Sequence, residues 1–547
     1  MRKWMVGMAA LCACLWLQAQ EKERVSLAIA HQIRNEAFGR NSKVMDTSFY
    51  LTDVHGPRLT GSPQAKRAAE WAVKQLTDWG LVNAKMEPWG TSFGKGWECT
   101  RYVAMMKTPE FQPIMGFAAP WSGSTAGDVT GDAVVAVITN PEEMEQWKGK
   151  LKGKIVLTAA AHADELPVTP LAVRLSDEEL AAASVAPDPT SGNPSSLPLG
   201  FVRGAPLNGG PAAGGRGAAG GRGGAGGRGG ANNFRAELAK FWKDEGVLVL
   251  VQPGSGAADG GTIMGSGQVL RTAADAPPLP TVIIANEHYN RIARLLEKQI
   301  PVSLEFDIQT KLTDVADSFN ITAEIPGTDP RAGIVMVGGH FDSWTGGTGA
   351  TDNGAGSAVA MEAVRILKSL DLKMARTVRV ALWTGEEQGL LGSRAYVKEH
   401  FADPADMKPK PEHAKLAAYF NLDNGGGRIR GIYMQDNDEM RPIFEAWLEP
   451  FKDLGATALT IRNTGSTDHV SFDAVGLPAF QFIQDPLDYG SRTHHSNMDV
   501  YDRLQANDME QASAVEAWCV YNAAVRPEML PRKPMPKPAA GRGGRGQ

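Results

Sequence analysis

The stretch from residue 334 to residue 342 reads IVMVGGHFD and decides the fold. Its first half, Ile334 to Val337, is typical of a buried strand, and the polar residues His340 and Asp342 follow it directly. Outward from this stretch, further buried strands are predicted at Val378 to Trp383, Leu416 to Leu422 and Ala479 to Ile483, with a helix at Ala355 to Leu370. Alternating strands and helices predict an α/β fold: a mixed sheet with helices on both faces.

Polar clusters follow two other predicted strands as well. Glu386 and Glu387 come just after Trp383, and Asp423 comes just after Leu422. In open α/β sheets, ligands collect at the carboxyl ends of the strands. Two further clusters lie elsewhere, in TDNG at 351–354 and HHS at 494–496. Histidines and carboxylates gathered at one edge of a sheet suit a hydrolytic zinc site, because zinc binds imidazole nitrogen and carboxylate oxygen.

The polar clusters lie in segments that resemble a known family. GGHFDSW, GATDNGAG, LWTGEEQG, NLDNGG and HHSNMD are similar, in that order, to the signature blocks of the di-zinc exopeptidases. This family includes bacterial leucyl aminopeptidase and plasma glutamate carboxypeptidase. HFDSW and LWTGEEQG look closest to the branch of the latter enzyme, and HGPRLTGS resembles the family's opening segment. Each block alone is weak, but together they are specific and cover most of the chain.

The resemblance implies two zinc ions and a ligand set for them. His340 and Asp423 are expected to bind one ion, and Glu387 and His495 the other. Asp352 is expected to bridge both ions. Two zinc ions about 3.5–4 Å apart can hold the reacting oxygens from both sides.

The resemblance also implies roles for residues that do not bind metal. Glu386 is the expected general base, and Asp342 is expected to orient His340. His494 is a candidate for the substrate pocket, where it would hold the oxyanion. For His469, lining the substrate pocket and simple packing remain equal alternatives.

These expectations define a function. The chain is predicted to be a zinc-dependent exopeptidase that hydrolyses small peptides, as a carboxypeptidase or dipeptidase. One alternative is an aminopeptidase with the same zinc site, since loops decide which peptide end is held. Another is a non-catalytic receptor or scaffold on the same fold, which the presence of all five ligands and Glu386 disfavours. An HExxH helix, typical of other zinc proteases, is absent from the sequence.

The chain is expected to have several parts. Residues 1–20 are predicted to be a signal peptide, 21–111 the N-terminal part of the peptidase domain, and 309–528 its catalytic part. Residues 112–308 contain short β-like runs and resemble an inserted, smaller β-rich protease-associated domain. The Gly/Arg tract at 204–231 and the tail at 529–547 are expected to be disordered, because they lack the apolar residues of a core. Ser62 and Pro63 predict a helix start, and Gly80 its end.

The net charge and the N-terminal sequence indicate which partners and which location to expect for the protein. The net charge of -5 does not indicate a nucleic-acid or membrane partner, and the Gly/Arg tract lacks the aromatic residues that would favour nucleic acid. Arg2 and Lys3 precede a short apolar run, which predicts export to a secreted or periplasmic location without a later membrane span. Cys99 and Cys519 form either one disulfide or two free thiols, and the sequence leaves an oligomer open.

Overall fold

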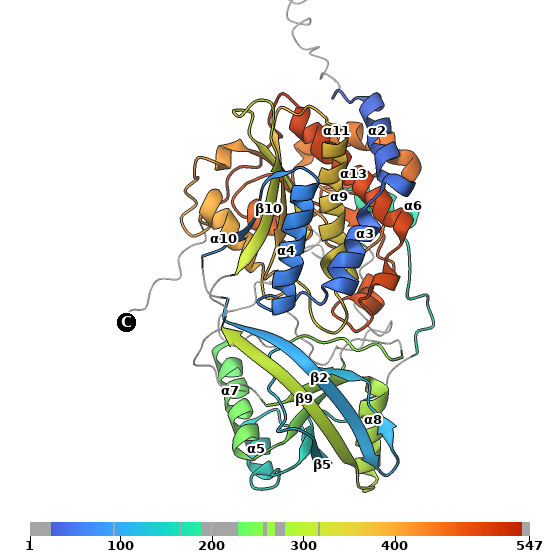
Figure 1. The fold of residues 1–547 in the computed structure, drawn as a ribbon, viewed down its shortest axis with the longest axis vertical. Helices are drawn as coiled ribbons and strands as arrows, with labels where there is room; N and C mark the ends of the chain where they lie inside the picture. Colours follow the sequence, from blue (N-terminus) through green and yellow to red (C-terminus); the bar gives the residue numbers. More distant parts are fainter. Residues whose placement is uncertain are drawn as a thin grey trace, which may run out of the picture.

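The computed structural model describes residues 23–90, 93–162, 166–187, 199, 228–254, 260–267, 279–314 and 318–538. They form two lobes, each built on its own eight-stranded sheet (Figure 1). The predicted signal peptide lies outside the described residues. Among the residues that are described, no helix is both long and apolar enough to cross a membrane.

The first sheet has the order β1-β10-β12-β11-β13-β16-β14-β15. Its strands are β1 (Val82–Pro88), β10 (Phe319–Ile325), β11 (Ile334–His340), β12 (Thr377–Trp383), β13 (Leu416–Asn421), β14 (Ile429–Tyr433), β15 (Ala458–Thr460) and β16 (Ala479–Gln484). Strands β12, β11, β13 and β16 are neighbours and run parallel, so their carboxyl ends share one edge. These are the four strands that the sequence predicts, and β10, β1 and β14 add antiparallel pairs.

Helices cover both faces of this sheet, which confirms the predicted fold class. One face carries α2 (Leu27–Ala37), α3 (Val44–Phe49), α4 (Pro63–Asp78), α9 (Ala355–Ser369), α11 (Arg441–Leu448) and α13 (Ala506–Val525). The other face carries α10 (Leu391–His400) and α12 (His469–Asp473). Helix α4 begins as predicted: the Ser62 hydroxyl accepts a hydrogen bond from the amide of Ala65 at 3.0 Å.

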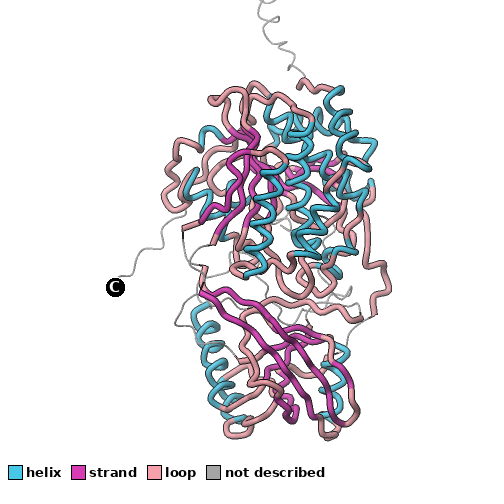
Figure 2. Tube along the Cα trace, viewed as in Figure 1, coloured by secondary structure: helices cyan, strands magenta, loops and turns pink. Residues whose placement is uncertain are grey.

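The second sheet has the order β3-β2-β9-β5-β6-β7-β8-β4 (Figure 2). Its strands are β2 (Lys95–Thr108), β3 (Gln112–Pro113), β4 (Gly116–Ala118), β5 (Val129–Val135), β6 (Ile155–Leu157), β7 (Val249–Pro253), β8 (Thr281–Ile284) and β9 (Ser303–Asp314). Helices α5 (Pro141–Trp147) and α7 (Arg228–Asp244) pack on one side of it, and α8 (Asn286–Glu297) on the other. Because the long pair β2 and β9 belongs to it, the second sheet extends beyond the predicted limits of 112 and 308 on both sides.

A segment of the second lobe returns to the first lobe. Helix α6 (Asp177–Ser184) lies between β6 and β7 in the chain, yet it packs on β15, the edge strand of the first sheet. Leu175 and Leu180 are buried there against Tyr433 and Ala458. We call residues 166–187 the strap.

Two predictions of disorder need correction. Helix α7 begins at Arg228, so residues 228–231 of the Gly/Arg tract are helical, while 204–227 lie outside the described residues. The start of the tail packs on the first lobe: Leu530 is buried, and Arg532 donates to the carbonyl of His413 at 3.1 Å, whereas residues 534–538 are exposed. Burial of an apolar side chain and hydrogen bonds to backbone carbonyls therefore order residues whose composition predicted disorder.

Cys99 and Cys519 do not form a disulfide. Cys99 lies on β2 in the second lobe, and Cys519 lies in α13 within the core of the first lobe. Both thiols are free, and burial raises the pKa of each of them. Of the two alternatives that the sequence leaves open, the free thiols are the correct one.

Candidate metal centre

Four parallel strands deliver the predicted ligands to one edge of the first sheet. His340 is the last residue of β11, and Asp423 follows β13. Glu387 follows β12, and His495 lies on the loop after β16. Asp352 lies in the turn η3 (Ala350–Gly354), which joins the loop after β11 to α9. The shared edge explains why residues up to 155 positions apart in sequence (340 to 495) lie together.

The five side chains form two sets that meet at one carboxylate. His340 Nε2 lies 3.2 Å from Asp352 Oδ1 and 3.2 Å from Asp423 Oδ1. His495 Nε2 lies 3.3 Å from Asp352 Oδ2 and 2.9 Å from Glu387 Oε2. Asp352 therefore turns one oxygen toward each imidazole. This is the arrangement that a carboxylate shared by two cations requires.

Several carboxylate oxygens of the cluster lack a hydrogen-bond donor and are free to bind a cation. Asp352 Oδ2, Glu387 Oε1 and Asp423 Oδ1 are buried and have no hydrogen-bond partner among the described residues. Burying a carboxylate without a partner is costly, so such groups pair or bind metal. The donor set of two imidazoles and three carboxylates is the set that zinc accepts.

Electrostatics lead to the same conclusion. Burial raises the pKa of Glu387, and the nearby carboxylate of Asp352 raises it further. Burial also raises the pKa of Glu386, beside Asp423 and Asp468. Burial opposes a charge on His340, yet the carboxylates of Asp423 and Glu386 outweigh it and raise the pKa of the imidazole. Like charges held this close require positive charge between them.

The turn that carries Asp352 is held by buried hydrogen bonds. Asp499 accepts from the amide of Thr351 at 2.5 Å and from the amide of Asp352 at 3.3 Å. Asn353 donates to the carbonyl of Leu422 at 2.8 Å, which ties the turn to the end of β13. Burial and the charge of Asp352 raise the pKa of Asp499 to about 7. Asp499 thus fixes the backbone of the shared carboxylate.

Asp342 lies beside His340 and contacts it through its backbone and its side chain. The atom nearest to His340 Nδ1 is the backbone oxygen of Asp342, at 2.9 Å, whereas its carboxylate lies 3.6 Å away. The carboxylate instead accepts from the hydroxyl of Thr60 at 2.7 Å and from the amide of Glu386 at 3.3 Å. The backbone of Asp342 thus orients the imidazole, while its side chain connects the loops beside it.

The loop that carries His495 depends on the second lobe. The amide of Gly265 donates to the carbonyl of His495 at 3.0 Å. The side chain of Asn497 accepts from the amide of Ile263 at 2.7 Å and donates to the carbonyl of Gly261 at 2.9 Å. The ring of Trp344, which packs in the core of the second lobe, lies edge-on to His495 with centroids 6.2 Å apart. The second lobe therefore forms one wall of the centre.

The two further histidines have separate positions. His494 stacks on His495, with ring centroids 3.7 Å apart, and its Nε2 lies 3.9 Å from Asp352 Oδ2. His494 therefore borders the cluster. His469 is fully buried at the start of α12 and faces Gln435 and the carbonyl of Thr464. Burial lowers the pKa of His469 to about 3, as for a neutral packing residue.

Two residues that fix the loops around the centre, Arg58 and Thr60, were not predicted from the sequence. Arg58 is fully buried, and its guanidinium donates to the carbonyls of Leu51, Phe341, Thr348 and Gly349 at 2.7–3.1 Å. Burial lowers its pKa to about 10, so it stays charged at neutral pH. Both residues lie in HGPRLTGS, so this segment contained the signal although no role was drawn from it.

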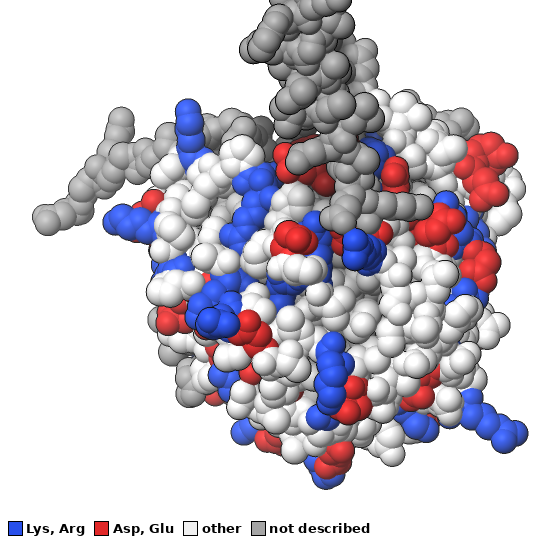
Figure 3. Space-filling model, turned by 90° about the horizontal axis from the view of Figure 1, so that it is seen from above, with Lys and Arg blue, Asp and Glu red and all other residues white. Residues whose placement is uncertain are grey.

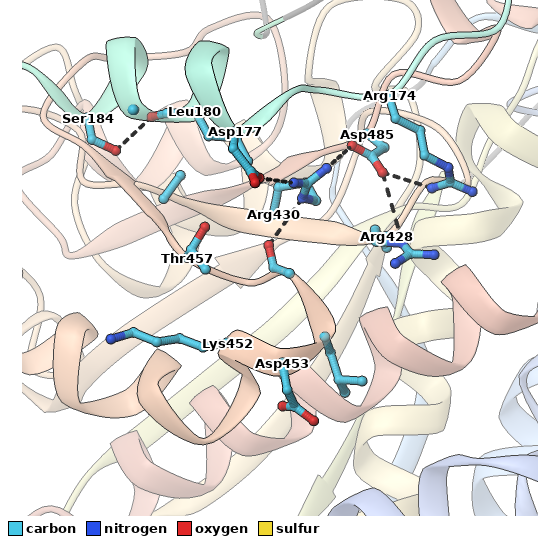
Figure 4. Close-up of a pocket in the computed structure, with 14 residues that line it drawn as sticks. Arg174, Asp177, Leu180, Ser184, Arg428, Arg430, Lys452, Asp453, Thr457 and Asp485 are labelled. Carbon is cyan, nitrogen blue, oxygen red and sulfur yellow. Dashed lines mark hydrogen bonds and ion pairs between the residues drawn. The ribbon is translucent and has the colours of Figure 1, made fainter.

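One cavity lies apart from this centre. It has a volume of about 590 Å³ and lies between α6, the start of β14 and the loop before β15 (Figure 4). Arg430 lies between Asp177 and Asp485, and Arg174 also pairs with Asp485 at 2.8 Å. The cavity contains none of the predicted site residues, and its arginines pair with its own carboxylates. We therefore assign it no chemistry.

The outer surface of the first lobe shows no area of one charge on the side seen in Figure 3. Basic and acidic side chains are interspersed there. A nucleic-acid site would need clustered basic residues along one face.

Comparisons with known proteins agree with this geometry. Residues 320–519 match the model of Peptidase family M28. The chain is 25% identical to carboxypeptidase Q of Bos taurus over 513 residues, which cover 93% of this chain and 90% of the relative. It is 30% identical to aminopeptidase YwaD of Bacillus subtilis over 205 residues, 36% of this chain and 43% of that one. The crystal structure of a peptidase M28 precursor from Shewanella amazonensis has a TM-score of 0.63 at 23% identity and covers 93% of this chain and 98% of its own.

Proposed function

Because residues 320–519 match the model of peptidase family M28, we propose that the chain is a two-zinc exopeptidase that acts on small peptides as a carboxypeptidase or dipeptidase. The observation that carries the proposal is the shared carboxylate of Asp352. Its two oxygens lie 3.2 and 3.3 Å from two different imidazoles. Each imidazole has a further carboxylate beside it, so the chain supplies two adjoining metal positions.

The ligand assignment follows from these two sets. His340 and Asp423 would hold one zinc ion, Glu387 and His495 the other, and Asp352 both. When bound, zinc lowers the pKa of a water molecule toward about 7 and polarises the peptide carbonyl. His494, on the open side of His495, is the candidate to donate to the oxyanion.

Glu386 is the proposed general base. It follows β12 next to Glu387, so Glu387 would hold metal while Glu386 would act on the reacting water. Its carboxylate would take a proton from the attacking water and pass the same proton to the leaving amine. Such a base typically contributes about 10²–10⁴-fold to the rate.

The preference for the carboxyl end of peptides rests on the extent of similarity. The likeness to carboxypeptidase Q runs through both lobes, whereas the likeness to aminopeptidase YwaD covers 36% of this chain. The loop that carries His495 contacts the second lobe, and the sequence likeness to carboxypeptidase Q extends through that lobe. An aminopeptidase with the same centre is the alternative that the experiment must separate.

We also propose that the protein works outside the cytoplasm. The support is the N-terminal sequence, in which Arg2 and Lys3 precede the apolar run from Trp4 to Leu17. N-terminal sequencing of the exported protein tests this. A mature chain that starts near Glu21 is expected, and an intact Met1 in the cytoplasm would contradict the proposal.

The central experiment is digestion of one short peptide in three forms: with free ends, N-acetylated and C-amidated. The purified, zinc-loaded protein is used, and products are identified by mass spectrometry. We expect C-amidation to block cleavage and N-acetylation to leave it. The Glu386→Gln protein keeps the size of the side chain and removes the base, so it is the matched control and should not cut.

Each other outcome has a definite meaning. Blocking by acetylation alone would make the chain an aminopeptidase with the same centre. Equal cutting by the Glu386→Gln protein would remove the role of the base. Absence of cleavage for all three peptides would favour a non-catalytic receptor or scaffold.

A further inference from the structure

Three loops of the first lobe are joined through one threonine hydroxyl. Thr60 lies in the turn before α4 and is 1% exposed. Its hydroxyl donates to Asp342 Oδ2 at 2.7 Å and accepts from the amide of Gly385 at 2.9 Å. The other oxygen of Asp342 accepts from the amide of Glu386 at 3.3 Å. Thr60, Asp342 and residues 385–386 thus form a closed ring of hydrogen bonds, which we call the Thr60 ring.

The direction of each hydrogen bond in the ring is fixed by chemistry. The Thr60 hydroxyl accepts from the backbone amide of Gly385, so its own proton is free to point to Asp342. The lone pairs of the hydroxyl then face the Gly385 amide, which only donates. Among the described residues, no other side chain accepts a hydrogen bond from the Gly385 amide. A hydroxyl is the group that satisfies both neighbours, because a carboxamide or an alkyl side chain cannot do so from one atom.

The Thr60 ring is attached to a rigid support. Arg58, two residues earlier, donates from its amide to Ser343 Oγ at 3.0 Å and accepts from the amide of Ser343 at 3.2 Å. Its guanidinium holds the carbonyls of Phe341 and Gly349. The segment 58–60 is therefore fixed to the loop that follows His340 before Thr60 reaches across to Gly385.

We propose that Thr60 is a positioning residue for Glu386, acting through Asp342 and the amides of Gly385 and Glu386. This inference rests on the proposed function for Glu386. Gly385 has a left-handed backbone, with φ at +73°, so the chain turns sharply just before the base. The Thr60 ring fixes that turn and hence the direction of the glutamate side chain. Thr60 itself contacts neither substrate nor metal in this proposal.

The proposal predicts a loss of turnover without a loss of binding. In Thr60→Val the shape of the side chain is kept, but the ring is opened at two bonds. A displacement of a catalytic group by about 1 Å costs up to about 10²-fold, so kcat should fall by roughly 10- to 100-fold. KM and the two-zinc stoichiometry should stay at the wild-type values. Thr60→Ser restores the hydroxyl and should restore kcat.

The experiment compares wild type, Thr60→Val, Thr60→Ser and Thr460→Val. Thr460 is a fully buried threonine at the end of β15, away from the centre, and controls for the loss of a buried hydroxyl. For each protein, kcat, KM and zinc content are measured. Hydrogen exchange of a peptide containing residues 383–391 is followed by mass spectrometry and needs no activity. Exchange should be faster in Thr60→Val alone.

The outcomes separate this inference from the function on which it rests. Wild-type kcat and wild-type exchange in Thr60→Val would overturn the inference. A Thr60→Val protein that loses zinc and KM together with kcat would also overturn it, since that pattern is general damage to the centre. If the wild type cuts no peptide, the proposed function fails, and exchange at 383–391 still decides whether the Thr60 ring holds the turn. If Thr60→Val does not fold, Thr60→Cys, which has a similar size and a weak donor, is measured in its place, with the same loss expected and unchanged kcat and exchange counting against the ring.

Discussion

The two halves of the metal centre are built differently. His340 ends a central strand and its side chain is 1% exposed, whereas His495 lies on a loop and its side chain is 30% exposed. The first half is held within the first lobe by Arg58 and Asp499. The second half is held by backbone pairing with residues 261–265 of the second lobe. One half is therefore preformed by the sheet, and the other depends on how two lobes fit together.

Removing the shared carboxylate should weaken zinc binding in both halves of the centre. In Asp352→Ala both imidazoles lose their common partner, so both positions should lose zinc. Metal catalysis supplies several kcal/mol, so kcat/KM should fall by at least about 10³-fold. Zinc content by mass spectrometry and peptide kinetics test this. One tightly held zinc ion in the variant would show that a single half is complete without Asp352.

Loosening the second lobe should affect one half only. Asn497→Leu removes both side-chain bonds to the second lobe, two residues after His495. Groups that orient metal ligands are worth about 10- to 100-fold in metal affinity, so one of the two zinc ions should become weaker by this factor. Competition with a chelator measures both affinities. Asn497→Asp keeps the acceptor for Ile263 and should lose less, and an equal effect on both ions would contradict the comparison.

A change in the core beneath the sheet should affect stability but neither half. Glu516 in α13 is fully buried, and both of its oxygens have no partner among the described residues. Burial raises the pKa of Glu516 well above its usual value. The folded state therefore holds the proton more tightly than the unfolded state. The stability that this gives is present at low pH and is lost as pH rises through the folded pKa.

Glu516→Met should consequently increase the free energy of unfolding at neutral pH by about 1–3 kcal/mol, the cost of a buried unsatisfied polar group. The gain should be smaller near pH 4, because Glu516 is then mostly protonated in the unfolded state as well, while the buried carboxyl still lacks a partner. Urea unfolding at both pH values tests this, with zinc content as a control. A gain of equal size at low pH would show that packing, rather than the carboxyl, is responsible.

The smallest effect is expected at an ion pair behind the sheet. His400 Nε2 lies 2.6 Å from Glu87 Oε1 and joins α10 to β1. Although burial opposes its charge, Glu412 and Glu87 raise the pKa of His400 to about 9. The contribution is full below the ordinary pKa of 6.5 and is lost as pH rises through about 9.

His400→Asn should therefore lower the melting temperature slightly at pH 6 and leave it unchanged at pH 10. Both side chains of the pair are partly exposed, which keeps the effect small. Thermal unfolding at the two pH values measures it. An equal loss at pH 10 would assign the effect to packing of the imidazole on Tyr396.

The sequence predicted the sheet half of the centre more fully than the loop half. Strands β11, β12 and β13 are apolar runs, and His340, Glu387 and Asp423 lie at or just after their ends, whereas His495 lies on the loop after β16. The supports were not predicted, because they join residues that are distant in sequence. Thr60 meets Asp342 across 282 positions, and Asn497 meets Ile263 across 234. The long pair β2 and β9 was missed for the same reason, since its alternating burial becomes visible only once the two strands face each other.

The strap has a consequence for the evolution and engineering of this chain. Strand β15 is short and lies at the edge of the first sheet, where unpaired backbone groups invite pairing with another molecule. Helix α6 covers that edge, and it is encoded within the second lobe. A peptidase lobe without residues 95–314 would thus expose the edge of β15, and the loop that carries His495 would lose its contacts with the second lobe. Helix α6, which belongs to the insertion, thus keeps other molecules from pairing with this edge. The two lobes should therefore be expressed and redesigned as one unit.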